Sequence, residues 1–159
     1  MKWTIGDVTV TLVRELSLPI PFESLIPDAD TTVIEANSSW MYPEFIDESG
    51  RMLLSFHALV LETNDRVILV DTCIGDRPIK DHEAISHIGD KFLRDLEAAG
   101  YPASRIDTVL CTHLHFDHVG WNTRWVDGRW VPTFPNARYL FSRADYEYWD
   151  AGNEGYALT

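Results

Sequence analysis

Hydrophobic and polar residues alternate along the chain near its N-terminus. Val8, Val10 and Leu12 fall on one side of an extended backbone, whereas Thr9 and Thr11 fall on the other. A period of two is typical of a β-strand with one buried face, and the Gly-Asp pair just before it is a turn sequence. The pattern therefore predicts a β-hairpin at the start of the chain.

Apolar segments then follow one another in the order strand, helix, strand. The sequences LLSFHALVLE (53–62) and RVILVD (66–71) are predicted to be strands joined by a short turn. Apolar residues recur at helical spacing over residues 90–99, and Gly100 is placed to end that helix. A further apolar strand is predicted over residues 106–112. This order predicts an α/β fold in which helices pack on a sheet.

Residues 18–52 have a different pattern. They hold four prolines, which interrupt regular elements, together with many apolar side chains. We therefore expect one long apolar loop here, which buries part of itself or covers another surface. Later in the chain, an Asp-Gly hairpin is expected over residues 124–131 and a short strand over residues 137–141. A helix is expected to start with Ser142 as its N-cap and Asp145 at its third position.

Length and charge narrow the class of protein. A chain of 159 residues without internal repeats is expected to form a single domain over residues 1–159. Its net charge of −12 would repel phosphate backbones, so nucleic acid is not an expected partner. Two cysteines are too few for a disulfide scaffold, and no apolar segment resembles a signal peptide or a membrane span. These features indicate a cytoplasmic protein with reduced thiols and no membrane partner.

The sequence THLHFDH (112–118) concentrates metal-binding side chains. His113 and His115 lie on one face of an extended chain, and two converging imidazoles suit Zn²⁺, Mn²⁺, Co²⁺ or Fe²⁺. A turn after His115 would bring Asp117 and His118 to the same side, where they would bind a second metal nearby. A single histidine at a strand end is usually structural, but three histidines and a carboxylate within six positions favour a metal site. These four residues are termed the His-Asp cluster.

Asp71 is a further candidate, because it directly follows another apolar strand. In open α/β sheets, ligands gather beyond the carboxyl ends of the strands. If the strands at 66–71 and 106–112 are neighbours, Asp71 and the His-Asp cluster point into one crevice. The alternative is that Asp71 only caps a turn at the end of its strand.

The spacing His-x-His-x-Asp-His after an apolar strand, together with VILVDTCIG upstream (67–75), resembles the metallo-β-lactamase-fold metallo-hydrolase superfamily. Within that superfamily, the chain is most similar to the branch of lactonases and organophosphate hydrolases. The likeness extends from the N-terminal hairpin to FPNARYLFSRADYEYW (134–149) and looks like only the N-terminal half of such a protein. It implies an α/β fold that is one half of an αβ/βα sandwich, with a mixed sheet and flanking helices.

The resemblance also implies a role for each residue of the His-Asp cluster. His113 and His115 would bind a first metal. Asp117 and His118 would bind a second, and Asp117 would also be the catalytic residue that orients a hydroxide between the metals and shuttles its proton. Asp71 would accept a hydrogen bond from a ligand histidine. One or two Zn²⁺ ions are the expected cofactor, with Mn²⁺, Co²⁺ or Fe²⁺ as alternatives.

The sequence departs from the family pattern at two points. Cys73 stands where the family usually has glycine, and its side chain would either crowd the crevice or be harmless. The family also completes its sites with two later histidines and a bridging aspartate, but no histidine follows His118 here. The chain thus holds four of the seven ligands that the resemblance implies. It is then an N-terminal fragment of a longer enzyme, a chain completed by a partner, or a short form with an incomplete site.

Three functions of different classes follow from these features. The first is a metal-dependent hydrolase that uses a metal-bound hydroxide on a small-molecule lactone, ester, β-lactam or phosphotriester. The second is a catalytically inactive, truncated metal-binding domain, and the third is an iron-dependent redox member of the same superfamily. Half of a sandwich would leave one apolar sheet face uncovered, so self-association through that face is expected. Trp121, Trp125 and Trp130 either line a hydrophobic pocket or belong to the core.

Overall fold

The structure, a computed structural model, describes residues 1–80 and 82–153. Its strands are β1 (Lys2–Ile5), β2 (Val8–Ile20), β3 (Met52–Glu62), β4 (Val67–Val70), β5 (Thr108–Leu110), β6 (Thr123–Val126), β7 (Arg129–Pro132) and β8 (Arg138–Leu140). Its helices are α1 (Thr31–Met41), α2 (Lys91–Ala98), α3 (Phe116–Val119) and α4 (Arg143–Asp150), with 3₁₀ turns η1 (Phe22–Ser24), η2 (Glu83–Ile85), η3 (Ala103–Arg105) and η4 (Gly120–Asn122).

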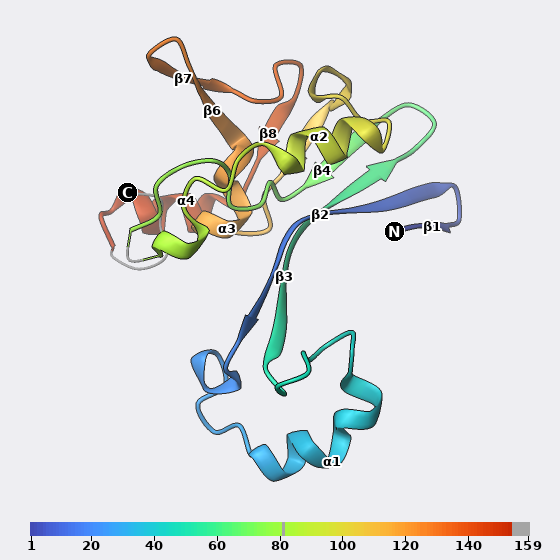
Figure 1. Ribbon diagram of the computed structural model, residues 1–159. Helices are drawn as coiled ribbons and strands as arrows, with labels where there is room; N and C mark the ends of the chain where they lie inside the picture. Colours follow the sequence, from blue (N-terminus) through green and yellow to red (C-terminus); the bar gives the residue numbers. More distant parts are fainter. Residues whose placement is uncertain (81, 154–159) are drawn as a thin grey trace. The chain divides into compact units, whose positions relative to one another are not determined.

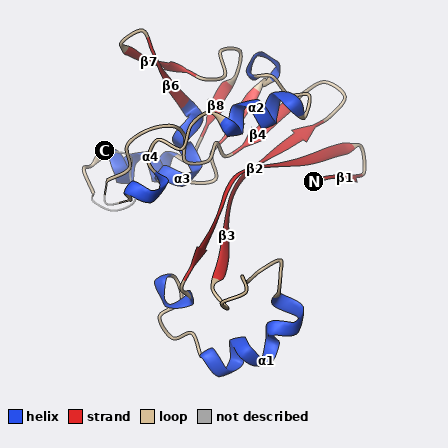
Figure 2. Cartoon of the chain, in the orientation of Figure 1, coloured by secondary structure: helices blue, strands red, loops and turns tan. Residues whose placement is uncertain are grey.

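The central feature of the fold is a six-stranded mixed sheet with the strand order β1-β2-β3-β4-β5-β8 (Figure 1). β1 pairs with β2 and β3 pairs with β4 in antiparallel orientation, whereas β4, β5 and β8 run parallel to one another. β6 and β7 form a separate antiparallel hairpin (Figure 2). The mixed sheet and its flanking helices confirm the α/β class expected from the sequence.

The chain divides into two compact units, a division that the sequence pattern did not predict. The larger unit comprises Met1–Glu15 and His57–Thr159, and the smaller unit comprises Leu16–Phe56. The strands β2 and β3 are long enough to run through both units. The alternation near the N-terminus predicted only the first part of β2, which continues to Ile20 although it contains Pro19.

One face of the sheet in the larger unit is buried, and the other is only partly buried. Val60, Leu69 and Val109 are fully buried and belong to one core cluster with side chains of α2. Residues that alternate with them along the strands are less buried, and Leu110 and Leu140 are 40% and 41% exposed. The helix expected over residues 90–99 therefore covers one face, while the opposite face is open to solvent at these two positions.

Most elements predicted for the larger unit are confirmed. They are the N-terminal hairpin, the strand pair β3–β4, helix α2, strand β5, the Asp-Gly hairpin β6–β7, strand β8 and helix α4. Ser142 precedes α4 as expected, but its side chain makes no capping hydrogen bond. In the described part of the chain, no helix combines the length and the apolar character needed to cross a membrane.

The smaller unit corrects the expectation of one long loop over residues 18–52. Helix α1 occupies its middle, and the Asp30 carboxylate caps this helix by accepting a hydrogen bond from the Thr32 N–H at 2.8 Å. The segment Thr31–Met41 contains no proline, and the helix ends before Pro43. The prolines therefore flank the regular element and do not interrupt it.

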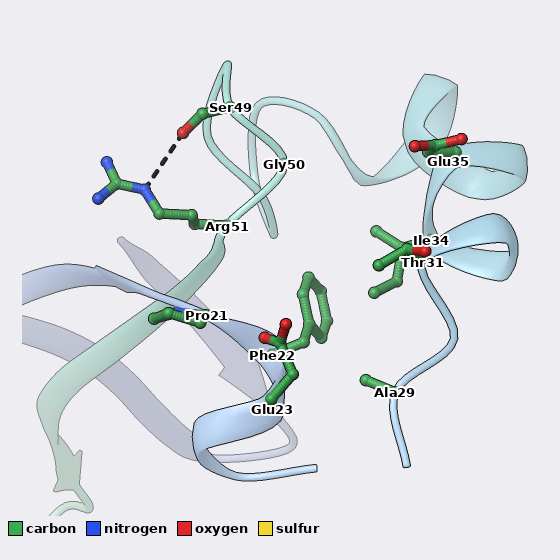
Figure 3. A pocket seen from close by; sticks show the side chains of 10 residues that line it. All are labelled: Pro21, Phe22, Glu23, Ala29, Thr31, Ile34, Glu35, Ser49, Gly50 and Arg51. Atoms are coloured by element: carbon green, nitrogen blue, oxygen red, sulfur yellow. Dashed lines mark hydrogen bonds between the residues drawn. The ribbon is translucent and has the colours of Figure 1, made fainter. Parts of the chain in front are cut away.

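The smaller unit also contains a cavity of about 270 Å³ (Figure 3). Phe22 and Ile34 form part of its apolar wall, and Glu23, Glu35 and Arg51 contribute charged side chains to its lining. No histidine or cysteine lines this cavity. It therefore holds none of the side chains on which the metal hypothesis depends.

Candidate metal centre

The candidate site lies where two parallel strands of the larger unit end. β4 ends at Val70 and is followed by Asp71, while β5 ends at Leu110, shortly before the His-Asp cluster. Val70 pairs with Leu110, and the Asp71 N–H donates to the Leu110 carbonyl at 2.9 Å. The two strands are neighbours, so their carboxyl ends meet at one edge of the sheet, the condition under which the sequence placed Asp71 and the His-Asp cluster in one crevice.

His113 and His115 have their ring nitrogens next to each other. His113 Nε2 and His115 Nδ1 are 3.1 Å apart, and the two ring centroids are 4.5 Å apart. Two nitrogens that each bind one tetrahedral Zn²⁺ at about 2.05 Å lie about 3.3 Å from each other. The observed separation therefore suits either a hydrogen bond between the rings or two bonds to one ion.

Asp117 and His118 reach the same region through a single helical turn. Helix α3 starts directly after His115, and the His118 N–H donates to the His115 carbonyl at 3.0 Å. The turn places Asp117 Oδ2 3.4 Å from His118 Nε2. This separation suits an ion pair while His118 is protonated, and it is also close to the ~3.3 Å between two donors on one ion. The His118 ring also lies against the His113 ring, with centroids 3.9 Å apart. The structure thus brings the whole His-Asp cluster together in the two expected pairs.

Asp71 holds the other ring nitrogen of His118. Its Oδ2 lies 2.8 Å from His118 Nδ1, and its Oδ1 accepts from the Thr112 N–H at 2.8 Å. The Thr112 hydroxyl also donates to this carboxylate, 2.8 Å from Oδ2. Since an ionised carboxylate only accepts hydrogen bonds, His118 Nδ1 carries a proton, and Nε2 is the nitrogen that faces Asp117. Asp71 therefore both caps a strand end and orients a histidine of the cluster.

These contacts set the charges of the cluster. Burial lowers the pKa of His118, but its bonds to Asp117 and Asp71 outweigh burial and raise that pKa to about 9. Burial opposes the ionisation of Asp117 and Asp71, yet hydrogen bonds, above all those to His118, lower the pKa of both carboxyls. Burial, followed by the neighbouring histidines, lowers the pKa of His113. At neutral pH without metal, the carboxylates are therefore ionised, His118 is protonated, and His113 is neutral and able to bind a cation.

The donor set fits divalent metals in kind but not in number. Imidazole nitrogens and carboxylate oxygens are typical zinc ligands, but a zinc site takes three or four protein ligands and each pair offers two. Accordingly, no group of three or more His, Cys, Asp or Glu side chains within residues 1–80 and 82–153 is arranged to hold an ion by itself. Each pair of the cluster would hold an ion only together with further ligands.

Helix α4 braces the cluster through contacts that the sequence did not reveal. The expected capping role of Asp145 is not realised, because its Oδ2 accepts from the Leu114 N–H at 2.6 Å, between the two histidines of the first pair. Trp149 of the same helix packs edge-on against His115, with ring centroids 5.8 Å apart. The Trp149 indole N–H is buried and has no hydrogen-bond partner among the described residues. No local pattern signals these contacts, since they join positions more than 30 residues apart.

The structure places Cys73 and Trp121 in the core, whereas Trp125 and Trp130 are exposed. Cys73 is fully buried in the core with a φ of 54°, a left-handed conformation that glycine adopts more easily than other residues. Trp121 also belongs to the core cluster. Trp125 and Trp130 pair with each other on the β6–β7 hairpin, where they are 58% and 47% exposed.

Comparisons with known proteins identify the family. A family model described as the metallo-beta-lactamase superfamily matches residues 56–157. Probable metallo-hydrolases of Mycobacterium tuberculosis and Mycobacterium bovis are each 31% identical over 74 residues, which cover 40% of this chain and 24% of each relative. The crystal structure of AbOPH, a hydrolase in the beta lactamase superfamily, is 27% identical with a TM-score of 0.69, and the match covers 93% of this chain and 46% of AbOPH.

Two further solved structures match at lower identity. A probable metal-dependent hydrolase from Staphylococcus aureus is 20% identical with a TM-score of 0.69, and the match covers 95% of this chain and 52% of that one. AidC, a dizinc quorum-quenching lactonase, is 19% identical with a TM-score of 0.68, with coverages of 94% and 46%. At these identities, the likeness shows the fold alone. The chain spans about half the length of these structures, as expected for half of such a fold.

Proposed function

The chain belongs to the metallo-beta-lactamase superfamily, and we propose that it provides part of the active site of a metal-dependent hydrolase. The two donor pairs carry the proposal, because each has the separation of two ligands on one ion. The hydrogen bond from His118 Nδ1 to Asp71 supports it, since ligand histidines usually donate their second N–H to a carboxylate or carbonyl. The 27% identity with the hydrolase AbOPH supports the reaction class.

The side chains of the cluster would act in distinct ways. Bound divalent cations, Zn²⁺ foremost, supply Lewis acidity and lower the pKa of a water molecule that serves as the nucleophile. Asp117, whose lowered pKa keeps it ionised at neutral pH, is proposed to orient that water and to take up its proton at the carboxylate oxygen that is not a metal donor. Asp71 fixes the ring of His118 so that Nε2, and not Nδ1, is turned toward the reacting groups.

The proposed substrate is a small molecule with an electrophilic carbonyl or phosphoryl group. Lactones, esters, β-lactams and phosphotriesters meet this description, and the shared fold with the lactonase AidC places lactones among the first to assay. The net charge of −12 disfavours a nucleic acid. We also propose a cytoplasmic location, which suits the two free, buried cysteines.

The number of donors favours a second candidate function, a metal-binding domain without catalysis. Two donors per ion neither hold a metal tightly nor define its geometry. On this view, the chain alone binds metal weakly and does not turn over substrate.

The test is an assay of the whole chain with Zn²⁺ or Co²⁺ against an N-acyl homoserine lactone, a nitrophenyl ester, a chromogenic β-lactam and a phosphotriester. His115→Ala removes one donor, and His87→Ala, at a side chain that is 67% exposed and outside the cluster, is the matched control. Hydrolase function predicts slow, metal-dependent turnover that is lost in His115→Ala only. Turnover that is equal in both variants would refute it, and metal uptake without any turnover would favour the second candidate.

A further inference from the structure

Glu15 is a buried carboxylate that no sequence pattern singled out. It ends the part of β2 that belongs to the larger unit, and it is only 6% exposed. Its Oε2 accepts from the Ile74 N–H at 2.8 Å, while its Oε1 accepts from the Gly75 N–H at 3.2 Å and from the Trp121 indole N–H at 2.7 Å. Burial raises the pKa of Glu15 despite these three donors, so keeping the carboxylate in this place is costly.

The three donors belong to two segments that pack backbone against backbone. Residues 71–75 and 118–121 are termed the strand-end junction. Its hydrogen bonds run from the Thr72 N–H to the His118 carbonyl, from the Gly120 N–H to the Cys73 carbonyl and from the Trp121 N–H to the Thr72 carbonyl, with lengths of 2.8, 2.7 and 3.0 Å. The segments are so close that a Cβ on Gly120 would lie 1.8 Å from the Ile74 carbonyl oxygen. The junction is therefore a tight contact with no space for adjustment.

Each segment of the junction carries one member of the candidate metal centre. Asp71 begins the first segment, and His118 begins the second. Their side chains are joined by the 2.8 Å bond at His118 Nδ1. Glu15 binds the opposite end of both segments at once, so it touches neither residue. It nevertheless joins the two segments whose first residues are Asp71 and His118.

Arg77 supports the same junction with the opposite charge. It is 9% exposed, and its guanidinium donates to the Gly120 carbonyl and, at 2.8 Å, to the Thr123 carbonyl. No carboxylate within residues 1–80 and 82–153 forms an ion pair with it, and its charge lies 4.7 Å from the centre of the Trp130 ring. Two buried charges, each bound to backbone groups, are a costly way to stabilise a fold when apolar packing would serve. Their arrangement is more consistent with a need to hold the junction in one place.

We propose that Glu15 is a positioning residue of the candidate metal centre, which holds the strand-end junction so that His118 Nε2 faces Asp117. This claim rests on the proposed function, because only a bound metal gives the orientation of His118 a use. Glu15 acts through the junction and is not itself a ligand.

The test compares Glu15→Gln with Thr11→Val in the full chain. Glu15→Gln keeps the size of the side chain but replaces one accepting oxygen with an N–H₂ group. This group cannot accept a hydrogen bond from the N–H donors that it faces. Thr11 lies on the same strand and is equally buried at 6%, and its hydroxyl pairs with Tyr101 OH at 3.3 Å, outside the junction. Thr11→Val therefore controls for the loss of a buried polar contact on β2.

Two measurements separate positioning from general stability. The first, without metal, is the hydrogen-exchange rate of the His118 Nδ1–H and of the Gly120 amide by NMR. The second is the affinity for Co²⁺ by titration. Glu15→Gln is expected to speed both exchange rates at least about tenfold and to weaken Co²⁺ binding by roughly ten- to a hundredfold, as outer hydrogen-bond partners of metal ligands do. Thr11→Val is expected to change neither, even if its melting temperature falls.

The outcomes decide the claim in each case. A folded Glu15→Gln variant whose His118 ring proton exchanges as slowly as in the wild type overturns it, and so does faster exchange with unchanged Co²⁺ affinity. If no form of the chain binds Co²⁺, the proposed function fails, and the ring-proton exchange alone decides whether Glu15 positions His118. If Glu15→Gln does not fold, Trp121→Phe removes one of the three donors and is expected to shift the same rates by a smaller factor; unchanged rates there overturn the claim.

Discussion

Replacing Asp71 with asparagine is expected to move the proton of the neutral His118 ring from Nδ1 to Nε2. In the wild type, the Asp71 carboxylate accepts from His118 Nδ1, and on its other side it accepts from the Thr112 N–H. An amide has only one accepting oxygen, which the Thr112 N–H would keep, so the N–H₂ group would face His118. Nδ1 must then accept this hydrogen bond. The proton would move to Nε2, the nitrogen that faces Asp117 and that a metal would need.

The structure gives the size of this effect. The pKa of His118 is raised from 6.5 to about 9, which corresponds to about 3 kcal/mol, and the bonds to Asp117 and Asp71 are the main causes that raise it. Because burial lowers the His118 pKa, the two carboxylates together raise it by more than this net shift, so Asp71→Asn is expected to lower the pKa by at least about one unit, or about 1.4 kcal/mol. The wrong tautomer and the lost anchor together are expected to weaken Co²⁺ binding by about ten- to a hundredfold.

The assay is a pH titration of the ring nitrogens of His118 by ¹H–¹⁵N NMR on metal-free protein, followed by a Co²⁺ titration. Asp107→Asn is the matched control, because Asp107 also accepts a backbone hydrogen bond, from the Val67 N–H at 2.8 Å. Within residues 1–80 and 82–153, no hydrogen bond or ion pair joins Asp107 to a histidine. The control is expected to leave His118 titrating near pH 9. An Asp71→Asn protein whose His118 still titrates near pH 9 with its proton on Nδ1 would refute the reasoning.

Three further predictions follow from the same structure. Gly120→Ala is expected to lower the free energy of unfolding by about 4 kcal/mol or more, because the new Cβ would lie 1.8 Å from the Ile74 carbonyl oxygen. Urea unfolding measures this loss, and a loss below about 1 kcal/mol would contradict the prediction. The free energy of unfolding of the metal-free protein is expected to fall by up to about 3 kcal/mol as pH rises from 6.5 through about 9. The reason is that the raised pKa of His118 stabilises the fold fully only below pH 6.5. A melting temperature in chelator that stays constant or rises across this pH range would contradict the prediction. The open sheet face at Leu110 and Leu140 predicts self-association at micromolar concentration, which a monodisperse monomer in light scattering would rule out.

The parts of the site that depend on short spacing were predictable from the sequence. All four members of the His-Asp cluster lie within six positions, and one helical turn after His115 is enough to bring the second pair to the first. The position of Asp71 followed from a general rule, because parallel neighbouring strands bring their carboxyl ends together. Short spacing along the chain therefore predicted that each apolar strand ends next to a candidate site residue, and that the four cluster residues lie close together.

Contacts between distant positions were not predictable in the same way. Glu15 and the Trp121 indole are 106 positions apart, and Asp145 and Leu114 are 31 apart, so no local pattern connects them. Helix α1 was missed for a different reason: proline content was weighed over the whole of residues 18–52, whereas only the positions of the prolines decide where a helix fits. The division into two units depends on tertiary contacts, which no periodicity contains.

The most direct test of the central claim is the zinc content of the chain after equilibrium dialysis at a defined micromolar Zn²⁺ concentration. We expect at most about one weakly held ion per chain, which chelator removes, because each donor pair of the cluster supplies two ligands. The double variant His115→Ala/His118→Ala is expected to fall to background, while His87→Ala keeps the wild-type content. Equal zinc in the wild type and the double variant would contradict the claim that the His-Asp cluster binds the metal, and two ions per chain that survive chelator would contradict the two-ligand argument.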